Sequence, residues 1–235
     1  MRHDGRTPSD LRPITITPDF VGNADGSALI EVGGTRVICT ASVEEGVPGW
    51  REGKGLGWLT AEYSMLPAST GRRRQRDSTR GKIDGRSTEI QRLIGRSLRA
   101  VFDPAGIGER TVWIDCDVLE ADGGTRCASI CGGYVAAQLA LAKVDDLPGA
   151  PFGDSVGAVS VGIVDGRPVC DLDYVEDSGA EADCNVIMTG GGELIEVQAS
   201  GEGATFTRAQ LDQLLDLAAA GITELTGAQR NAIGS

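Results

Sequence analysis

One segment of the sequence joins glycines to side chains that bind anions. Gly123 and Gly124 precede Thr125 and Arg126, between an expected strand and the start of an expected helix. Glycines let the backbone approach an anion closely, free amides at a helix start point toward it, and the threonine and arginine add further donors. This pattern is compatible with a phosphate site. On its own it is more typical of a structural helix start, and residues 33–36 repeat the same four letters.

A second segment gathers acidic side chains. Residues 171–183 carry six carboxylates directly after an expected strand. Crowded carboxylates raise one another's pKa, and a hard cation such as Mg²⁺ relieves their repulsion. The segment is compatible with a metal site or a general acid. It is also compatible with a solvated acidic turn, which spacing alone favours.

The charge of the chain is distributed unevenly. The net charge of −12 over 235 residues argues, as an average, against a nucleic-acid partner. Residues 72–99 nevertheless carry ten basic and three acidic residues, a net charge of +7, which leaves −19 for the remainder. Such a separation predicts either a polyanion site within a repelling surface or an arginine-rich loop that helps to assemble an oligomer.

The single histidine narrows the chemistry further. His3 lies in a segment that we expect to be mobile, and a Ser-His-Asp triad, a Cys-His dyad or a multi-histidine zinc site would each need it. Acid–base chemistry therefore falls to carboxylates or to the substrate. The six cysteines lack C-x-x-C spacing and are expected to be small buried hydrophobic residues in a reducing compartment.

The surrounding pattern predicts strand groups interleaved with isolated helices, an α+β fold with mixed αβ layers. Two hairpins are expected, one at Gly33-Gly34 and one across residues 190–192, which hints at an internal duplication. The expected strands are 28–32, 35–43, 111–119, 158–164, 168–172, 185–189 and 193–198, and the expected helices are 90–102, 125–144 and one from Thr207.

Two features of the arginine-rich region follow from this pattern. The helix at 90–102 carries Arg92, Arg96 and Arg99 on the face opposite its apolar stripe, with Arg86 at its entrance ahead of a Thr88-x-x-Gln91 capping box. Residues 68–82 have little periodicity and are expected to form a partly mobile loop that orders on binding.

Hydrophobic residues make up 40% of the chain, but no apolar stretch approaches the roughly 20 residues that a membrane span requires. The first residues also lack the apolar region of a secretory signal. We therefore expect a cytoplasmic protein with no membrane partner.

Several motifs occur together and in order along the chain. They are Arg2-His3-Asp4-Gly5-Arg6, Asp84-Gly85-Arg86-Ser87, Asp122-Gly123-Gly124-Thr125-Arg126, Leu172-Asp173-Tyr174-x-Glu176-Asp177-Ser178 and Asp183-x-Asn185-Val186. In this set the sequence resembles the ribonuclease PH family over nearly its whole length. The resemblance implies the ribonuclease PH-like fold, similar to domain 2 of ribosomal protein S5, as one domain over 1–235 with two related αβ halves near 1–145 and 146–235. It also implies a homohexamer built as a trimer of dimers.

The resemblance further implies an activity and a site. The activity is phosphorolytic 3′ to 5′ trimming of tRNA precursors and other RNA 3′ ends, which releases nucleoside diphosphates and can run in reverse. Inorganic phosphate, the co-substrate, would be held by Arg86, Gly124, Thr125 and Arg126. Asp177 and Asp183 would be catalytic, with Mg²⁺ or a similar divalent ion between them and the RNA. Asn185 stands where polynucleotide phosphorylase, a relative, has a lysine.

The remaining arginines would be divided between guiding RNA and contacting neighbouring subunits; they are Arg72, Arg73, Arg74, Arg76, Arg92, Arg96 and Arg99. Two alternatives stay open at this point. The chain could be a non-catalytic RNA-binding ring subunit of the same superfamily, or a hydrolytic metal nuclease.

Overall fold

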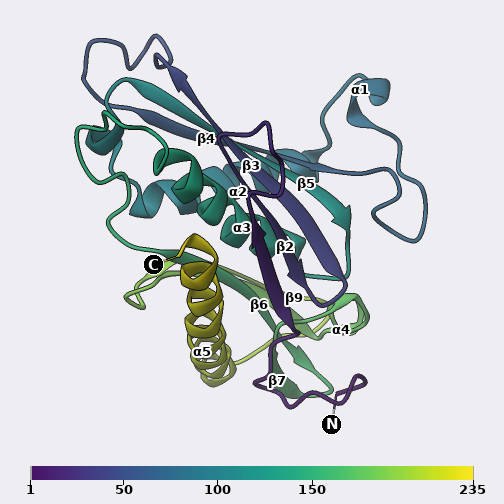
Figure 1. The fold of residues 1–235 in the computed structure, drawn as a ribbon. Helices are drawn as coiled ribbons and strands as arrows, with labels where there is room; N and C mark the ends of the chain where they lie inside the picture. The colour runs from purple at the N-terminus through teal and green to yellow at the C-terminus, as the bar shows by residue number, and fades with distance from the viewer. Residues whose placement is uncertain (1, 235) are drawn as a thin grey trace.

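The computed structural model describes residues 2–234 and contains two β-sheets with helices between and beside them (Figure 1). The first sheet has the order β1-β2-β3-β5-β4. Its strands are β1 (Ile14–Pro18), β2 (Gly26–Val32), β3 (Thr35–Glu45), β4 (Trp58–Met65) and β5 (Arg110–Glu120). All neighbours are antiparallel except β4 and β5, which are parallel.

The second sheet is antiparallel throughout and has the order β7-β6-β8-β9. Its strands are β6 (Val156–Val164), β7 (Arg167–Cys170), β8 (Ala182–Thr189) and β9 (Leu194–Gly201). The helices are α1 (Asp77–Arg80), α2 (Gly85–Val101), α3 (Thr125–Leu141), α4 (Tyr174–Gly179) and α5 (Arg208–Ile233), with a 3₁₀ turn at Pro104–Ile107. This arrangement confirms the α+β prediction.

Helix α3 lies between the two sheets and is buried on nearly every side (Figure 1). Its small residues allow this, as the sequence predicted. At Gly26 of β2 an added Cβ would lie 2.2 Å from the carbonyl oxygen of Ala136, so the strand and the helix backbone touch. All six cysteines are buried, and burial raises the pKa of the Cys131 thiol to about 12, which confirms their role as core residues.

Turn and capping residues in the sequence predict several of the elements correctly. The Gly33-Gly34 hairpin and the second hairpin pair as expected, and Thr207 caps α5 with the predicted capping box through Gln210. The capping box proposed at Thr88 is wrong, because α2 already begins at Gly85 with Asp84 as its N-cap. Arg86 therefore lies in the first turn of the helix.

Strands β1 and β4 were not predicted. β4 pairs with β5, which is some fifty residues later, so no hairpin marks it. β1 is an edge strand, and within residues 2–234 it pairs with β2 alone. The segment that carries α1 projects from the body of the molecule (Figure 1), and among residues 68–82 only Asp77–Arg80 is helical. None of the helices in residues 2–234 combines the length and apolar character that crossing a bilayer requires.

Candidate active site

A cavity of about 820 Å³ opens between the start of α2, the start of α3 and helix α4. Its lining includes four residues that the sequence selected, which are Arg86, Gly124, Thr125 and Asp177. Arg72 and Arg74 from the projecting segment also reach it. Residues that are widely separated in sequence thus meet at one place.

The turn before α3 is built to expose backbone amides. Gly123 and Gly124 both have positive φ, at 76° and 66°, a conformation that glycine adopts without strain. Gly124 is the N-cap of α3, and no side chain among residues 2–234 caps the helix. The first amides of a 17-residue helix therefore remain available for an anion, with the positive end of the helix dipole behind them.

Tyr63 holds the threonine of this turn. Its hydroxyl lies 2.9 Å from Oγ1 of Thr125, and both residues are buried. Burial raises the pKa of Tyr63, so the phenol stays neutral. Sequence reasoning missed this contact, because the only signal at Tyr63 was the alternation of strand residues.

The acidic pair is placed by α4 and β8. Asp177 faces the cavity, and its pKa is raised by partial burial and then by the charge of Asp183, while Arg86 and Arg126 oppose the shift. Oδ1 of Asp183 is buried and accepts no hydrogen bond within residues 2–234. Two carboxylates with an unsatisfied oxygen form a donor set that a hard divalent cation fits.

Arg126 lies beside the cavity and not on its wall. Its guanidinium donates to Oε1 of Gln198 at 3.0 Å and to Oε1 of Glu89 at 3.4 Å. Arg86, by contrast, forms no ion pair within the described part of the chain and is exposed. Of the two arginines expected at the phosphate, Arg86 has no ion-pair partner within residues 2–234, whereas Arg126 is bound to Gln198 and Glu89.

The other arginines separate into groups. Arg72 and Arg74 lie at the cavity, whereas Arg76 lines a neighbouring depression with Ser87. Arg92, Arg96 and Arg99 line a third depression with Trp58, which confirms that they share one face of α2. Arg96 is paired with Glu196 and Arg99 is stacked over Trp58, so the structure does not bring this group to the cavity.

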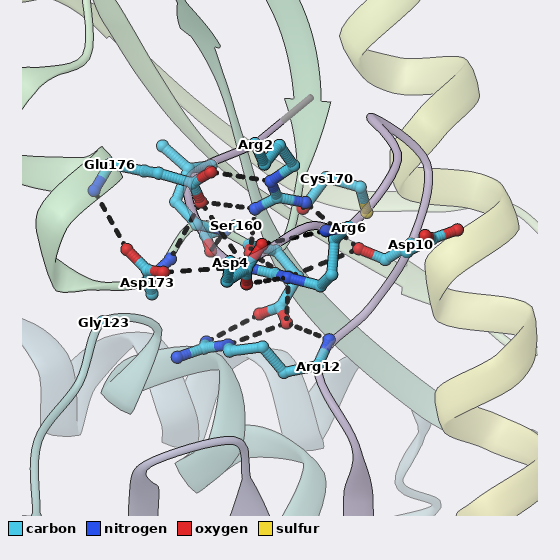
Figure 2. A network of polar contacts seen from close by, with 12 residues as sticks. Arg2, Asp4, Arg6, Asp10, Arg12, Gly123, Ser160, Cys170, Asp173 and Glu176 are labelled. Atoms are coloured by element: carbon cyan, nitrogen blue, oxygen red, sulfur yellow. Dashed lines mark hydrogen bonds and ion pairs between the residues drawn. The ribbon is translucent and has the colours of Figure 1, made fainter.

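The N-terminal segment is ordered by buried polar contacts, and the expectation that it is mobile is wrong (Figure 2). His3 contacts Asp173 through Nε2 and Oδ2 at 2.6 Å. Arg12 binds both carboxylate oxygens of Asp171, at 2.7 and 2.9 Å, and donates to the carbonyl of Asp122 beside the glycine turn. Much of the acidic run is therefore buried and paired, and is not a solvated turn.

Comparisons with known proteins agree with this geometry. The model of the 3′ exoribonuclease family, domain 1, matches residues 10–144, and that of domain 2 matches residues 154–221. A ribonuclease PH of Syntrophomonas wolfei is 55% identical over 236 residues, and one of Roseobacter denitrificans is 56% identical over 235 residues. Each match covers 99% of both chains.

Solved structures share the fold at low identity. Rice (Oryza sativa) Rrp46 has a TM-score of 0.81 at 18% identity, covering 99% of this chain and 100% of that one. An Archaeoglobus fulgidus exosome with RNA bound to the active site has a TM-score of 0.81 at 22% identity, covering 96% and 91%. Taken with the full-length matches, these findings show that the chain belongs to the 3′ exoribonuclease family and, within it, to the ribonuclease PH proteins, which are phosphate-dependent exoribonucleases of tRNA.

Proposed function

We propose that the cavity between α2, α3 and α4 is the centre at which this chain cleaves RNA with inorganic phosphate. The observation that carries the proposal is the meeting of Arg86, the Gly124–Thr125 turn and Asp177 on one cavity wall. Cationic and amide donors thus line the same cavity as the Asp177 carboxylate, whose pKa the charge of Asp183 raises further. A site of this kind can hold two phosphate groups that repel each other.

The reaction suits a chain with one histidine, because phosphate is already anionic at neutral pH and needs no base. A phosphate oxygen attacks the phosphorus of the last phosphodiester, the bond to the 3′ oxygen breaks, and a nucleoside diphosphate leaves. Arg86 and the amides of α3 hold the attacking phosphate, and Thr125, fixed by Tyr63, orients it. Arg126 joins this set by exchanging its bonds to Gln198 and Glu89 for bonds to the anion.

Asp177 and Asp183 act at the departing oxygen, where a carboxyl group of the pair supplies the proton that this oxygen takes up. The buried Oδ1 of Asp183, which has no hydrogen-bond partner within the described residues, supports a divalent ion at the pair. Mg²⁺ held there would shield the charge that develops on the oxygen.

We infer that Arg72, Arg73, Arg74 and Arg76 guide the RNA 3′ end, and that Arg92, Arg96 and Arg99 either contact RNA outside the cavity or contact neighbouring subunits. The likeness to exosome cores supports a ring, and we propose a homohexamer of three dimers in which each chain is one domain with halves 1–145 and 146–235. The six free, buried cysteines support a reducing, cytoplasmic location.

The test is an RNA with a free 3′ hydroxyl, incubated with and without inorganic phosphate and with the released nucleotide identified. We expect nucleoside diphosphates only when phosphate is present, and loss of at least about 10²-fold in rate for Arg86→Ala and for Arg126→Ala. Arg208→Ala, an exposed arginine on α5, is the matched control and should keep full activity.

Three results would contradict the proposal. Release of monophosphates would identify a hydrolytic nuclease, and binding of RNA without any cleavage would identify an inert ring subunit. Loss of the assembled ring in the Arg86 or Arg126 variant, measured by sedimentation, would make that arginine structural.

A further inference from the structure

Helix α4, which carries Asp177, is poorly anchored by its own side chains. It has six residues, and isolated helices of that length are unstable in water. Its apolar residues face outward, with Tyr174 63% and Val175 60% exposed. Glu176 is its only buried residue, so the hydrophobic effect does not hold the helix itself in place.

The buried Glu176 is held from the other end of the chain. Nε of Arg2 donates to Oε1 of Glu176 at 2.7 Å, and a second guanidinium nitrogen donates to Oε2 (Figure 2). The side chains of Arg2 and Glu176 are 5% and 4% exposed. This two-point contact between an arginine and a carboxylate fixes both distance and orientation.

Arg2 also binds the strand end that leads into α4. Its guanidinium donates to the carbonyl oxygens of Cys170 at 2.6 Å and Asp171 at 2.8 Å. Arg6 reaches the same cluster: it donates to the carbonyl oxygen of Asp171 at 2.9 Å, but its contact with Glu176 is longer, at 3.5 Å. Arg2 therefore ties the end of β7 to α4, on the side of the helix opposite the solvent.

The amide of Asp177, the residue after Glu176, donates to the carbonyl of Asp173 at 2.9 Å, within the same helical turn. Asp173 and Glu176 also form a reciprocal capping box. A displacement of Glu176 would therefore move Asp177. We propose that Arg2 is a positioning residue of the active site, which acts through Glu176 to hold the Asp177 carboxylate at the cavity; this rests on the proposed function of Asp177.

The experiment compares Arg2→Ala with Arg110→Ala in the full-length protein. Arg110 is a matched control, because it also forms ion pairs with two acidic side chains, Glu45 at 2.7 Å and Asp146 at 2.9 Å, and its side chain is only 13% exposed. We expect Arg2→Ala to lower kcat roughly 10- to 100-fold, as misplacement of a reacting group does, with KM for RNA and for phosphate within about twofold of the parent. Arg110→Ala should keep kcat.

Two further variants separate positioning from loss of structure. Arg2→Lys keeps the charge but not the planar fork, and should recover part of kcat. If Arg2→Ala does not fold, Glu176→Gln takes its place, since it keeps the size of the side chain and should show the same selective loss of kcat. Hydrogen exchange of residues 173–180 should become faster in the impaired variants while the two sheets stay protected.

The outcomes distinguish a failure of the proposed function of the cavity from a failure of the proposed positioning role of Arg2. If Asp177→Asn keeps full kcat, the proposed function of the cavity has failed. If Asp177→Asn is inactive but Arg2→Ala and Glu176→Gln keep the parental kcat, as Arg110→Ala does, the positioning role is overturned and the proposed function stands. The same holds if Arg2→Ala and Glu176→Gln lose RNA binding and kcat together.

Discussion

Tyr174 is an exposed aromatic side chain on the wall of a cationic cavity, and its neighbour Val175 is almost equally exposed but does not line that cavity. Exposed aromatic rings in such surroundings are the usual stacking partners of single-stranded nucleic-acid bases. Tyr174 and Val175 are almost equally exposed, but Tyr174 lines the cavity and Val175 does not. Val175 is therefore a matched control for mutation of Tyr174.

We expect Tyr174→Ala to raise KM for RNA about tenfold, because a stacked base contributes about 1–3 kcal/mol. Tyr174→Phe keeps the ring and should keep KM, and Val175→Ala should leave KM unchanged. Steady-state kinetics with a single-stranded RNA at saturating phosphate measures this. Equal effects of the Tyr174 and Val175 alanine variants would exclude stacking.

At the scale of the elements, the glycine turn and the segment before α4 touch each other. An added Cβ at Gly123 would lie 2.6 Å from the carbonyl oxygen of Leu172 and 2.7 Å from the carbonyl carbon of Asp173. These are backbone atoms, which cannot rotate away. The glycine turn and the segment that leads into α4 are therefore packed as one unit.

Gly123→Ala should destabilise the protein by more than Gly166→Ala, as measured by denaturant unfolding. Gly166 has nearly the same φ, 71° against 76°, but no atom lies within 4 Å of its added Cβ, so its variant isolates the backbone cost of about 1–2 kcal/mol. Gly123→Ala adds the clash with Leu172 and should also reduce the rate of phosphorolysis. Equal unfolding free energies for the two variants would show that an added Cβ at Gly123 does not clash with the backbone of Leu172 and Asp173.

The elements also differ in how well the sequence predicts them. The hairpin at Gly33-Gly34, the small-residue helix α3 and the cap at Thr207 depend on neighbours in sequence, and their predictions are confirmed. β4 depends on a distant parallel partner, and the ordered N-terminal segment depends on carboxylates about 170 residues away, so neither has a local signal. Arg86, Gly124, Thr125 and Asp177 were selected from motifs, whereas Tyr63 and Arg12 emerge only when the chain is folded.

At the scale of the whole molecule, a net negative chain carries a cluster of arginines without ion-pair partners near the cavity. Arg72, Arg73, Arg76 and Arg86 form no ion pair within residues 2–234, while Arg74 is paired with Asp84 and Arg80 with Asp77. Unpaired guanidinium groups in an acidic protein attract a polyanion to one place and repel it elsewhere. The projecting segment that carries α1 extends this cluster away from the body (Figure 1).

RNA affinity should therefore fall as salt rises, with a log–log slope of about −0.7 for each phosphate contacted. Arg73→Ala should make the slope shallower by roughly 0.7, and Arg208→Ala on α5 should leave it unchanged. Binding titrations across a series of salt concentrations measure both slopes. A response to salt that is flat, or equally steep in Arg73→Ala and the parent, would remove the projecting segment from RNA binding.

The contact between Arg2 and Glu176 joins residues 174 positions apart. Contacts of such large sequence separation form slowly, because loop-closure entropy opposes them. During translation the first residues leave the ribosome long before their acidic partner has been made. In the proposed cleavage site, Asp177 therefore gains the support of Arg2 only after translation has passed residue 176.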